Sequence, residues 1–189
     1  FTNSARLADP RPVLWDSIDA YVHAFDDGAI ATQPLLASWL DHPELHGWAK
    51  LVAAMFIAEA ACLRNDVEVA LAAAATIEPH TGQFAVVGHS TALRGPVDRV
   101  LALCFSVVGR HDAAVSSARS ALQQARIGGA SLWTSHCQLA LAEVLSRQGT
   151  NQALAEVAVL VATVGDGAPV SPLVSWKLAR LGGSAAACL

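Results

Sequence analysis

Residues 101–125 read LALCFSVVGRHDAAVSSARSALQQA, and residues 139–163 read LALAEVLSRQGTNQALAEVAVLVAT. Each stretch is rich in Ala and Leu on both sides of a turn, which is centred on Gly109 in the first and on Gly149 in the second. Ala and Leu have high helix propensity, and glycine readily adopts the positive φ with which many helices end. Each stretch therefore predicts two helices joined by a tight turn, which is a helical hairpin.

The hairpin recurs along the chain. The two turn glycines lie 40 residues apart, and a weaker third copy has Asn65 at its turn, 44 residues before the first glycine. Small residues, among them Ala102, Ala114 and Ala142, fall where two helices must approach closely. One hairpin cannot bury its own apolar face, so hairpins stack and share a core. The pattern predicts an all-α fold of stacked antiparallel hairpins. The alternative is an irregular bundle whose hairpins match only because Ala and Leu are common.

Composition narrows the class of protein. The chain has 189 residues, of which 53% are hydrophobic and 15% charged, and this balance excludes intrinsic disorder. A net charge of −4, with 12 Lys and Arg spread along the chain, argues against direct nucleic-acid binding. The longest apolar run, 51–63, is too short to span a membrane and carries Glu59. Among the basic residues Arg far outnumbers Lys, which is typical of a GC-rich bacterial gene.

Breaker residues divide the chain into segments. We expect a linker over 1–12, a helical repeat domain over 13–181 and a flexible tail over 182–189. The expected helices are 13–25, 33–40, 45–63, 67–77, 97–108, 113–127, 132–148, 152–164 and 172–181. The Gly- and Pro-containing segment 79–96 predicts a long loop with room for one helical turn. Because the sequence begins at Phe1, we expect it to be a piece of a longer protein.

Residues 95–125 resemble a tetratricopeptide repeat. The residues that match the signature of this family are Leu101, Ala102, Phe105, Gly109, Ala114 and Ala121. The chain departs from the family at Asp98, where the family has Trp, and it lacks the closing Pro. The spacing of 40–44 residues is also longer than the usual 34 of this repeat. The resemblance implies that the hairpins stack as a TPR-like superhelix, an α-solenoid.

The longer spacing is similar to that of the helical C-terminal regions of large bacterial LuxR-type and AfsR/SARP-type transcription regulators. The segment LLASWLDHPELHGWAKLVAAM, residues 35–55, resembles a recurring segment of those regions, and the resemblance extends over 33–165. In that family the helical region is a sensor or coupling scaffold beside an ATPase domain and a DNA-binding domain. This chain has no GxxxxGK[ST] motif and no basic recognition helix. The resemblance implies a cytoplasmic, non-catalytic scaffold whose partners are neighbouring domains, a peptide or a small effector.

The repeat also indicates where a partner would bind. In stacked hairpins the first helices line the concave surface. The positions that the signature offsets place outward on those helices are Glu59, Arg99, Leu103, Ser106, His136, Glu143 and Arg147. Several of these residues are charged or polar, so we hypothesise a groove that binds a peptide, another domain or a small effector. A solvated face with incidental charges is the alternative, and the sequence does not decide between the two.

Other residues that could carry chemistry favour simpler interpretations. The cluster His42, Glu44 and His46 lacks the zinc-protease spacing and is typical of a helix cap, so we expect no metal, no cofactor and no catalytic residue. Four separated cysteines predict buried free thiols in a reducing cytoplasm. Two alternatives stay open. One is a helical enzyme or ligand carrier with a pocket near 79–96 that uses His80 and His89, and the other is an oligomerisation scaffold.

Overall fold

The computed structural model describes residues 10–24, 40, 42, 45, 47–87, 92–164 and 172–186. Within these residues the chain is mostly helical, with one short two-stranded sheet. The elements in chain order are α2 (Pro10–His23), α4 (Gly47–Arg64), α5 (Val67–Ile77), the 3-10 helix η1 (Glu78–His80), β1 (Phe84–Val87), β2 (Ala92–Pro96), α6 (Val97–Val107), α7 (His111–Ile127), α8 (Ser131–Gln148), α9 (Asn151–Thr163) and α10 (Pro172–Ala186).

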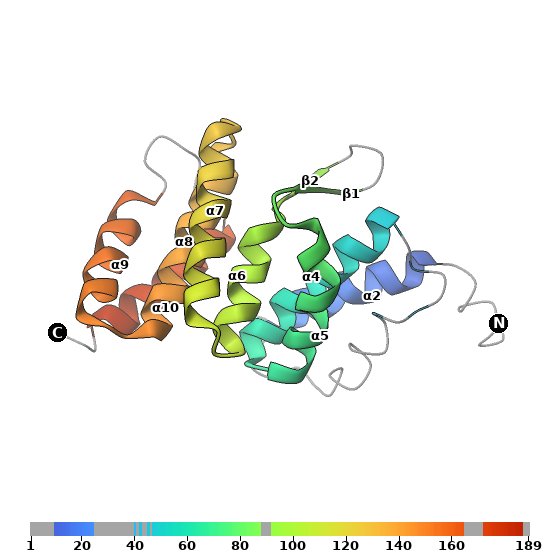
Figure 1. The fold of residues 1–189 in the computed structure, drawn as a ribbon, viewed down its shortest axis with the longest axis horizontal. Coiled ribbons are helices and arrows are strands. Elements are labelled where there is room, and N and C mark those ends of the chain that lie inside the picture. The colour runs from blue at the N-terminus through green and yellow to red at the C-terminus, as the bar shows by residue number, and fades with distance from the viewer. Residues whose placement is uncertain are drawn as a thin grey trace.

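Three consecutive helical hairpins form the body of the molecule (Figure 1). Helices α4 and α5, α6 and α7, and α8 and α9 pack as pairs, and each pair also packs against the next. The predicted turn residues Asn65, Gly109 and Gly149 all have positive φ, at 57°, 79° and 69°. This left-handed conformation reverses the chain within a few residues, so the two helices of a hairpin can lie against each other. The three predicted turns are confirmed.

Small side chains bring these helices together. Ala102, Ala114 and Ala142 have no exposed surface, as expected for positions where helices approach closely. Two helices also begin with side-chain caps. Asp66 Oδ1 accepts a hydrogen bond from Val69 N at 3.1 Å, and Thr150 Oγ1 accepts one from Ala153 N at the same distance. These caps satisfy amide groups that have no partner inside their helices.

The segment 79–96 corrects the prediction of a loop. The end of η1 is the one helical turn for which the prediction left room. The correction is an antiparallel pair of strands in which Phe84 faces Pro96 and Val87 faces Ala92, with an irregularity after Ala85. Gly95 has a φ of 93° and lies against the Trp133 ring, so only a residue without a side chain fits there. The sheet packs on α4 and α7, which supply the apolar surface that so short a hairpin lacks.

Both predicted chain ends are also corrected. Helix α2 starts at Pro10, inside the expected linker, because proline is well tolerated in the first turn of a helix. Helix α10 continues to Ala186, so part of the expected tail is helical. The predicted helix 33–40 lies outside the described residues except for Leu40, which is helical and buried.

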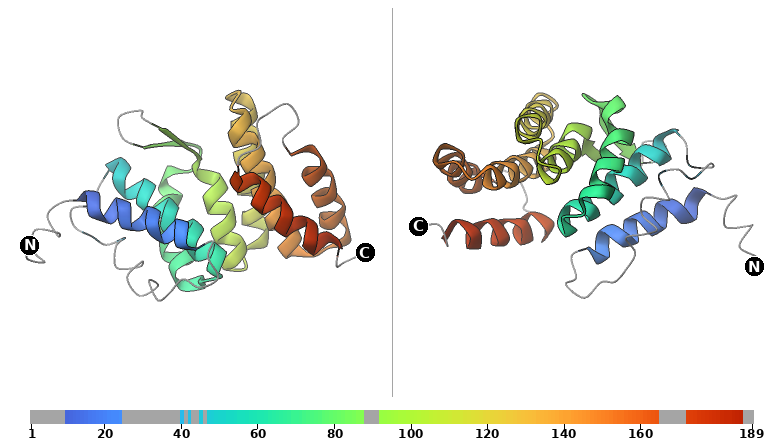
Figure 2. Two further views of the ribbon diagram at one scale, coloured as in Figure 1. Left: turned by 180° about the vertical axis from the view of Figure 1, so that it is seen from behind. Right: turned by 60° about the horizontal axis from the view of Figure 1, so that its bottom comes forward.

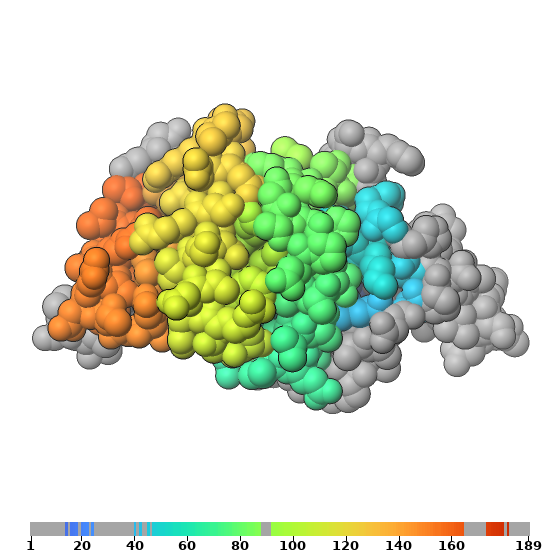
Figure 3. Space-filling view, viewed as in Figure 1, coloured from blue at the N-terminus to red at the C-terminus, as the bar shows by residue number. Residues whose placement is uncertain are grey.

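Helices α2 and α10 lie along the same edge of the molecule, where the C-terminal end of α4 lies between them (Figure 2). Helix α2 packs on α4, and α10 packs on α8 and α9. The opposite face, seen in the space-filling view, is dominated by α5, α7 and α9 (Figure 3). The terminal helices therefore cover the side on which α4, α6 and α8 carry their polar residues.

Candidate functional site

A cluster of three charged side chains is buried between α4, β2 and α6. Arg99 Nη1 donates a hydrogen bond to Glu59 Oε1 at 2.6 Å, and Arg94 Nη2 forms an ion pair with Glu59 Oε2. The side chain of Arg99 is only 2% exposed, that of Glu59 3% and that of Arg94 10%. One carboxylate therefore balances two guanidinium groups, and one positive charge is left in excess.

Aromatic rings hold the two guanidinium groups. The Arg94 guanidinium carbon lies 4.2 Å from the centre of the Phe56 ring and 5.4 Å from that of Tyr21 on α2. That of Arg99 lies 5.6 Å from the centre of the Trp133 ring. Cation–π contacts of this kind compensate part of the lost hydration. Burial, and next the charge of Arg99, still lower the pKa of Arg94 to about 9, and burial lowers the pKa of Arg99.

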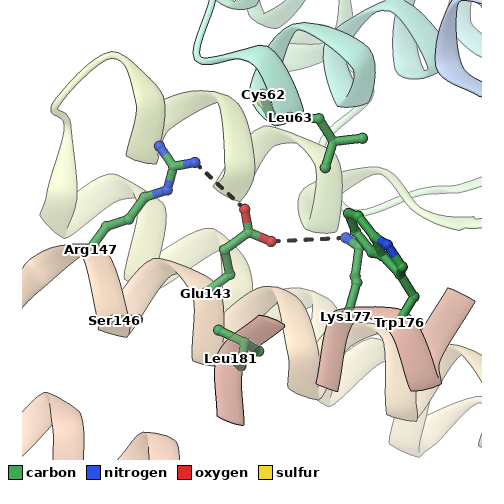
Figure 4. Close-up of a pocket in the computed structure, with 8 residues that line it drawn as sticks. All are labelled: Cys62, Leu63, Glu143, Ser146, Arg147, Trp176, Lys177 and Leu181. Carbon is green, nitrogen blue, oxygen red and sulfur yellow. Dashed lines mark ion pairs between the residues drawn. The ribbon is translucent and has the colours of Figure 1, made fainter. Parts of the chain in front are cut away.

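A cavity of about 200 Å³ opens beside this cluster, between the C-terminal ends of α4 and α8 and the middle of α10 (Figure 4). The residues that line it are Cys62, Leu63, Glu143, Ser146, Arg147, Trp176, Lys177 and Leu181. Glu143 lies between two cations, with Oε1 at 3.7 Å from Arg147 Nη2 and Oε2 at 3.9 Å from Lys177 Nζ. Burial lowers the pKa of Lys177, and the charge of Glu143 opposes that effect.

The cavity continues into a second, smaller pocket of about 10 Å³. This pocket shares Cys62, Leu63, Glu143 and Lys177 with the cavity, and its other lining residues are Tyr21, Glu59 and Leu103. The charged cluster and the cavity are thus two parts of one region, which we call the polar cleft. Its ionised side chains are Arg94, Arg99, Arg147, Lys177, Glu59 and Glu143, which carry two positive charges in excess.

The structure brings most of the predicted concave-face residues into the polar cleft. Glu59, Leu103, Glu143 and Arg147 line its two pockets, and Arg99 is paired with Glu59. The expectation that all seven positions face outward is wrong for five of them. Glu59, Arg99, Leu103, Ser106 and His136 are only 2–8% exposed. The reason is tertiary, since α4, α6 and α8 pack on one another while α2 and α10 cover α4 and α8.

His136 and Ser106 do not line either pocket of the cleft. The His136 ring packs 5.2 Å from the Trp133 ring, centre to centre. Burial, followed by the nearby charges of Arg99 and Lys177, lowers the pKa of His136 to about 3. The imidazole therefore stays neutral at physiological pH and serves as packing beside the charged cluster.

Sequence reasoning missed several residues of the region, among them Arg94, Trp176 and Lys177. Arg94 lies in the segment expected to be a loop, and Trp176 and Lys177 lie on α10, outside the three hairpins. One signal was present, because Lys177 is one of only two lysines in an Arg-rich chain. Asp98, which departs from the repeat signature, has a structural role. It accepts hydrogen bonds from Gly82 N, Ser120 Oγ and Gln124 Nε2 and joins the turn before β1 to α7.

The described cysteines are buried thiols, as predicted. Cys62 Sγ lies 3.9 Å from Cys104 Sγ, and Cys137 is likewise free and buried. The hydrogen bond with Cys104, together with burial, raises the pKa of Cys62, and burial raises the pKa of Cys137 to about 12. The thiols of Cys62 and Cys137 are therefore uncharged at physiological pH. Cys188 lies outside the described residues.

The remaining predicted polar residues are only partly described. His80 ends η1 and is half-buried, and His42 is half-buried as well, whereas His89, Glu44 and His46 lie outside the described residues. No three His, Cys, Asp or Glu side chains in the described ranges are grouped so as to hold a metal ion. Nor does that part of the chain contain a helix both long and apolar enough to cross a membrane.

Comparison of the chain with known proteins finds no matching family model, no matching curated protein and no matching solved structure.

Proposed function

We propose that the chain is a non-catalytic interaction and coupling module of a larger bacterial transcription regulator that works in the cytoplasm. The resemblance of residues 33–165 to the helical regions of such regulators supports this function. The finer architecture belongs to the same proposal, which is that α4–α9 are three repeats of a TPR-like superhelix. Hairpins that pack in chain order, with turns at Asn65, Gly109 and Gly149, support this architecture.

The observation that supports the functional proposal most directly is the packing of α10 on the polar cleft. Lys177 and Trp176 of this helix form one wall of the cavity, and α4 and α8 form the others. A change in what occupies the cleft alters the contacts of α10. In repeat proteins each element touches only its neighbours, so such a change can be passed along the stack. The module would thereby couple occupation of the cleft to the domains beside it.

The proposal is tested by transcription in the bacterium that carries the gene. We expect deletion of the gene to change the transcript levels of a defined set of genes. Lys177→Met, which removes a charge from the cleft, should change the same set, and Lys50→Met, at a position outside both pockets, should not. Immunoblots must show equal amounts of the variants. Unchanged transcripts after deletion would overturn the regulatory function.

The two alternatives from the sequence stay predictions. One alternative places a ligand pocket near residues 79–96, whereas the two pockets described above lie at α10 and α4. An oligomerisation scaffold would bury exposed apolar side chains such as Leu71, Ile127 and Val159, which lie on three different helices.

A further inference from the structure

We propose that the cavity between α4, α8 and α10 binds a small organic monoanion, a carboxylate with a short apolar body. This inference deepens the proposed function, on which it rests for its biological meaning, because it names the class of effector. Binding itself is measured on the purified chain, so its failure is distinguishable from the failure of the regulatory function.

The charge of the cavity favours an anion. Its three ionised side chains are Arg147, Lys177 and Glu143, so one positive charge is left over. The adjoining cluster has the same excess of one positive charge, because Arg94 and Arg99 share the single carboxylate of Glu59. A cation that is removed from water without a matching anion is costly. A bound carboxylate would supply the missing negative charge, whereas a cation would add to the excess.

The geometry leaves these groups able to bind a ligand. The distances of 3.7 Å and 3.9 Å from Glu143 to its two cations are longer than hydrogen bonds, so both pairs are loose. The other terminal nitrogen of Arg147, Nη1, donates a hydrogen bond to Asn65 Oδ1 at 3.1 Å. This bond fixes the guanidinium group at the edge of the cavity. Lys177 is only 9% exposed and points its ammonium group toward Glu143 (Figure 4). Glu143 holds neither cation by a hydrogen bond, so a ligand carboxylate that enters the cavity beside it would accept hydrogen bonds from Lys177 and Arg147.

The remaining walls define the body of the ligand. Leu63 and Leu181 are apolar, and Trp176 adds an aromatic side chain. Cys62 contributes a thiol whose pKa is raised by its hydrogen bond with Cys104 and by burial, so it adds no charge. The volume of about 200 Å³ is below the roughly 300–1,000 Å³ that is usual for drug-sized ligands. A carboxylate with a body about as large as one aromatic ring fits these limits.

Such a ligand would join α8 and α10. Lys177 belongs to α10 and Arg147 to α8, so one carboxylate bridging them strengthens the docking of α10. Anion binding thereby stabilises one position of the helix on which the proposed coupling depends. The expected signature is slower hydrogen exchange in α10.

The test uses benzoate as the probe, with benzamide and acetate as matched controls. We expect saturable binding of one benzoate by calorimetry, and a change in tryptophan fluorescence that Trp176→Phe removes. Benzamide keeps the ring without the charge, and acetate keeps the charge without the ring. Each should bind at least about tenfold more weakly than benzoate. Absence of saturable benzoate binding up to tens of millimolar, or equal binding of benzoate and either control, would overturn the proposal.

Variants locate the binding. Lys177→Met keeps the apolar stem and should weaken benzoate at least about tenfold, whereas Lys50→Met, the other lysine, should change it less than about twofold. Arg147→Gln, at a partly exposed position, is a second variant that should keep the fold and also weaken binding. Far-UV circular dichroism verifies folding of each variant. Benzoate affinity that survives both cleft substitutions, or exchange in α10 that benzoate leaves unchanged, would contradict the proposed site.

Discussion

Replacement of Glu59 by Gln should destabilise the chain more than removal of either cation that it binds. The carboxylate pairs with both Arg94 and Arg99, and all three side chains are buried. Glu59→Gln leaves two guanidinium groups in the interior without a counter-charge. Loss of one partner of a buried ion pair costs about 3–5 kcal/mol, and we expect a value in this range. That is a large part of the roughly 5–15 kcal/mol by which a domain is stable.

Removal of one of the two arginines should lower the free energy of unfolding by less than Glu59→Gln does. Arg94→Met leaves Arg99 and Glu59 as a matched pair, joined by the hydrogen bond of 2.6 Å, and removes the surplus charge. It loses the contacts with the rings of Phe56 and Tyr21, which are worth about 2 kcal/mol or less. The order of destabilisation therefore follows from the number of charges that each change leaves unpaired.

Urea unfolding followed by circular dichroism measures both effects as shifts of the midpoint at constant slope. Glu156→Gln is the matched control, because Glu156 pairs with Arg119 at 2.8 Å but on the surface. That pair should contribute no more than about 1 kcal/mol. The reasoning is refuted if Arg94→Met costs as much as Glu59→Gln, or if Glu59→Gln costs no more than the surface control.

Three further changes test other parts of the structure. His136 has a pKa of about 3 in the folded chain and of 6.5 in the unfolded chain. Above pH 6.5 the imidazole is neutral in both states, so its contribution to stability is complete there. That contribution falls by at most about 1.4 kcal/mol per pH unit as the pH drops toward 3. His136→Gln should therefore flatten the fall in urea midpoint with acid, and an equally steep fall would contradict the assignment. Gly95→Ala places a methyl group on the Trp133 ring at positive φ and should cost about 1–3 kcal/mol, with a changed near-UV spectrum. Thr150→Ala removes the cap of α9 and should cost about 1 kcal/mol by urea unfolding, whereas no loss would mean that the cap is dispensable.

The helices were predictable because their signals are local. Helical periodicity gave the bounds of α5 without error, and the turn residues Asn65, Gly109 and Gly149 marked the hairpins. The sheet at 84–96 was not predictable in this way. Its strands are short, and its stability comes from packing on α4 and α7 rather than from its own residues.

The candidate site was predictable only in part. The repeat offsets identified Glu59, Glu143 and Arg147, which do line the polar cleft. The same offsets placed Arg99 on an outer surface, whereas it is 2% exposed. An offset places a residue on one face of its helix and carries no information on what covers that face.

Local sequence determined the helices, their turns and the small residues that let them pack, because each of these depends on neighbours within a few positions. Tertiary structure alone decided which charges meet. Glu59 and Arg99 are separated by 40 residues, and α10 brings Lys177 to Glu143 from outside the three hairpins. The polar cleft exists because α2 packs on α4 and α10 packs on α8, which buries Glu59 and Lys177 and leaves Glu143 and Arg147 partly exposed. Burial on that scale depends on the relative positions of whole helices, which no single stretch of the sequence encodes.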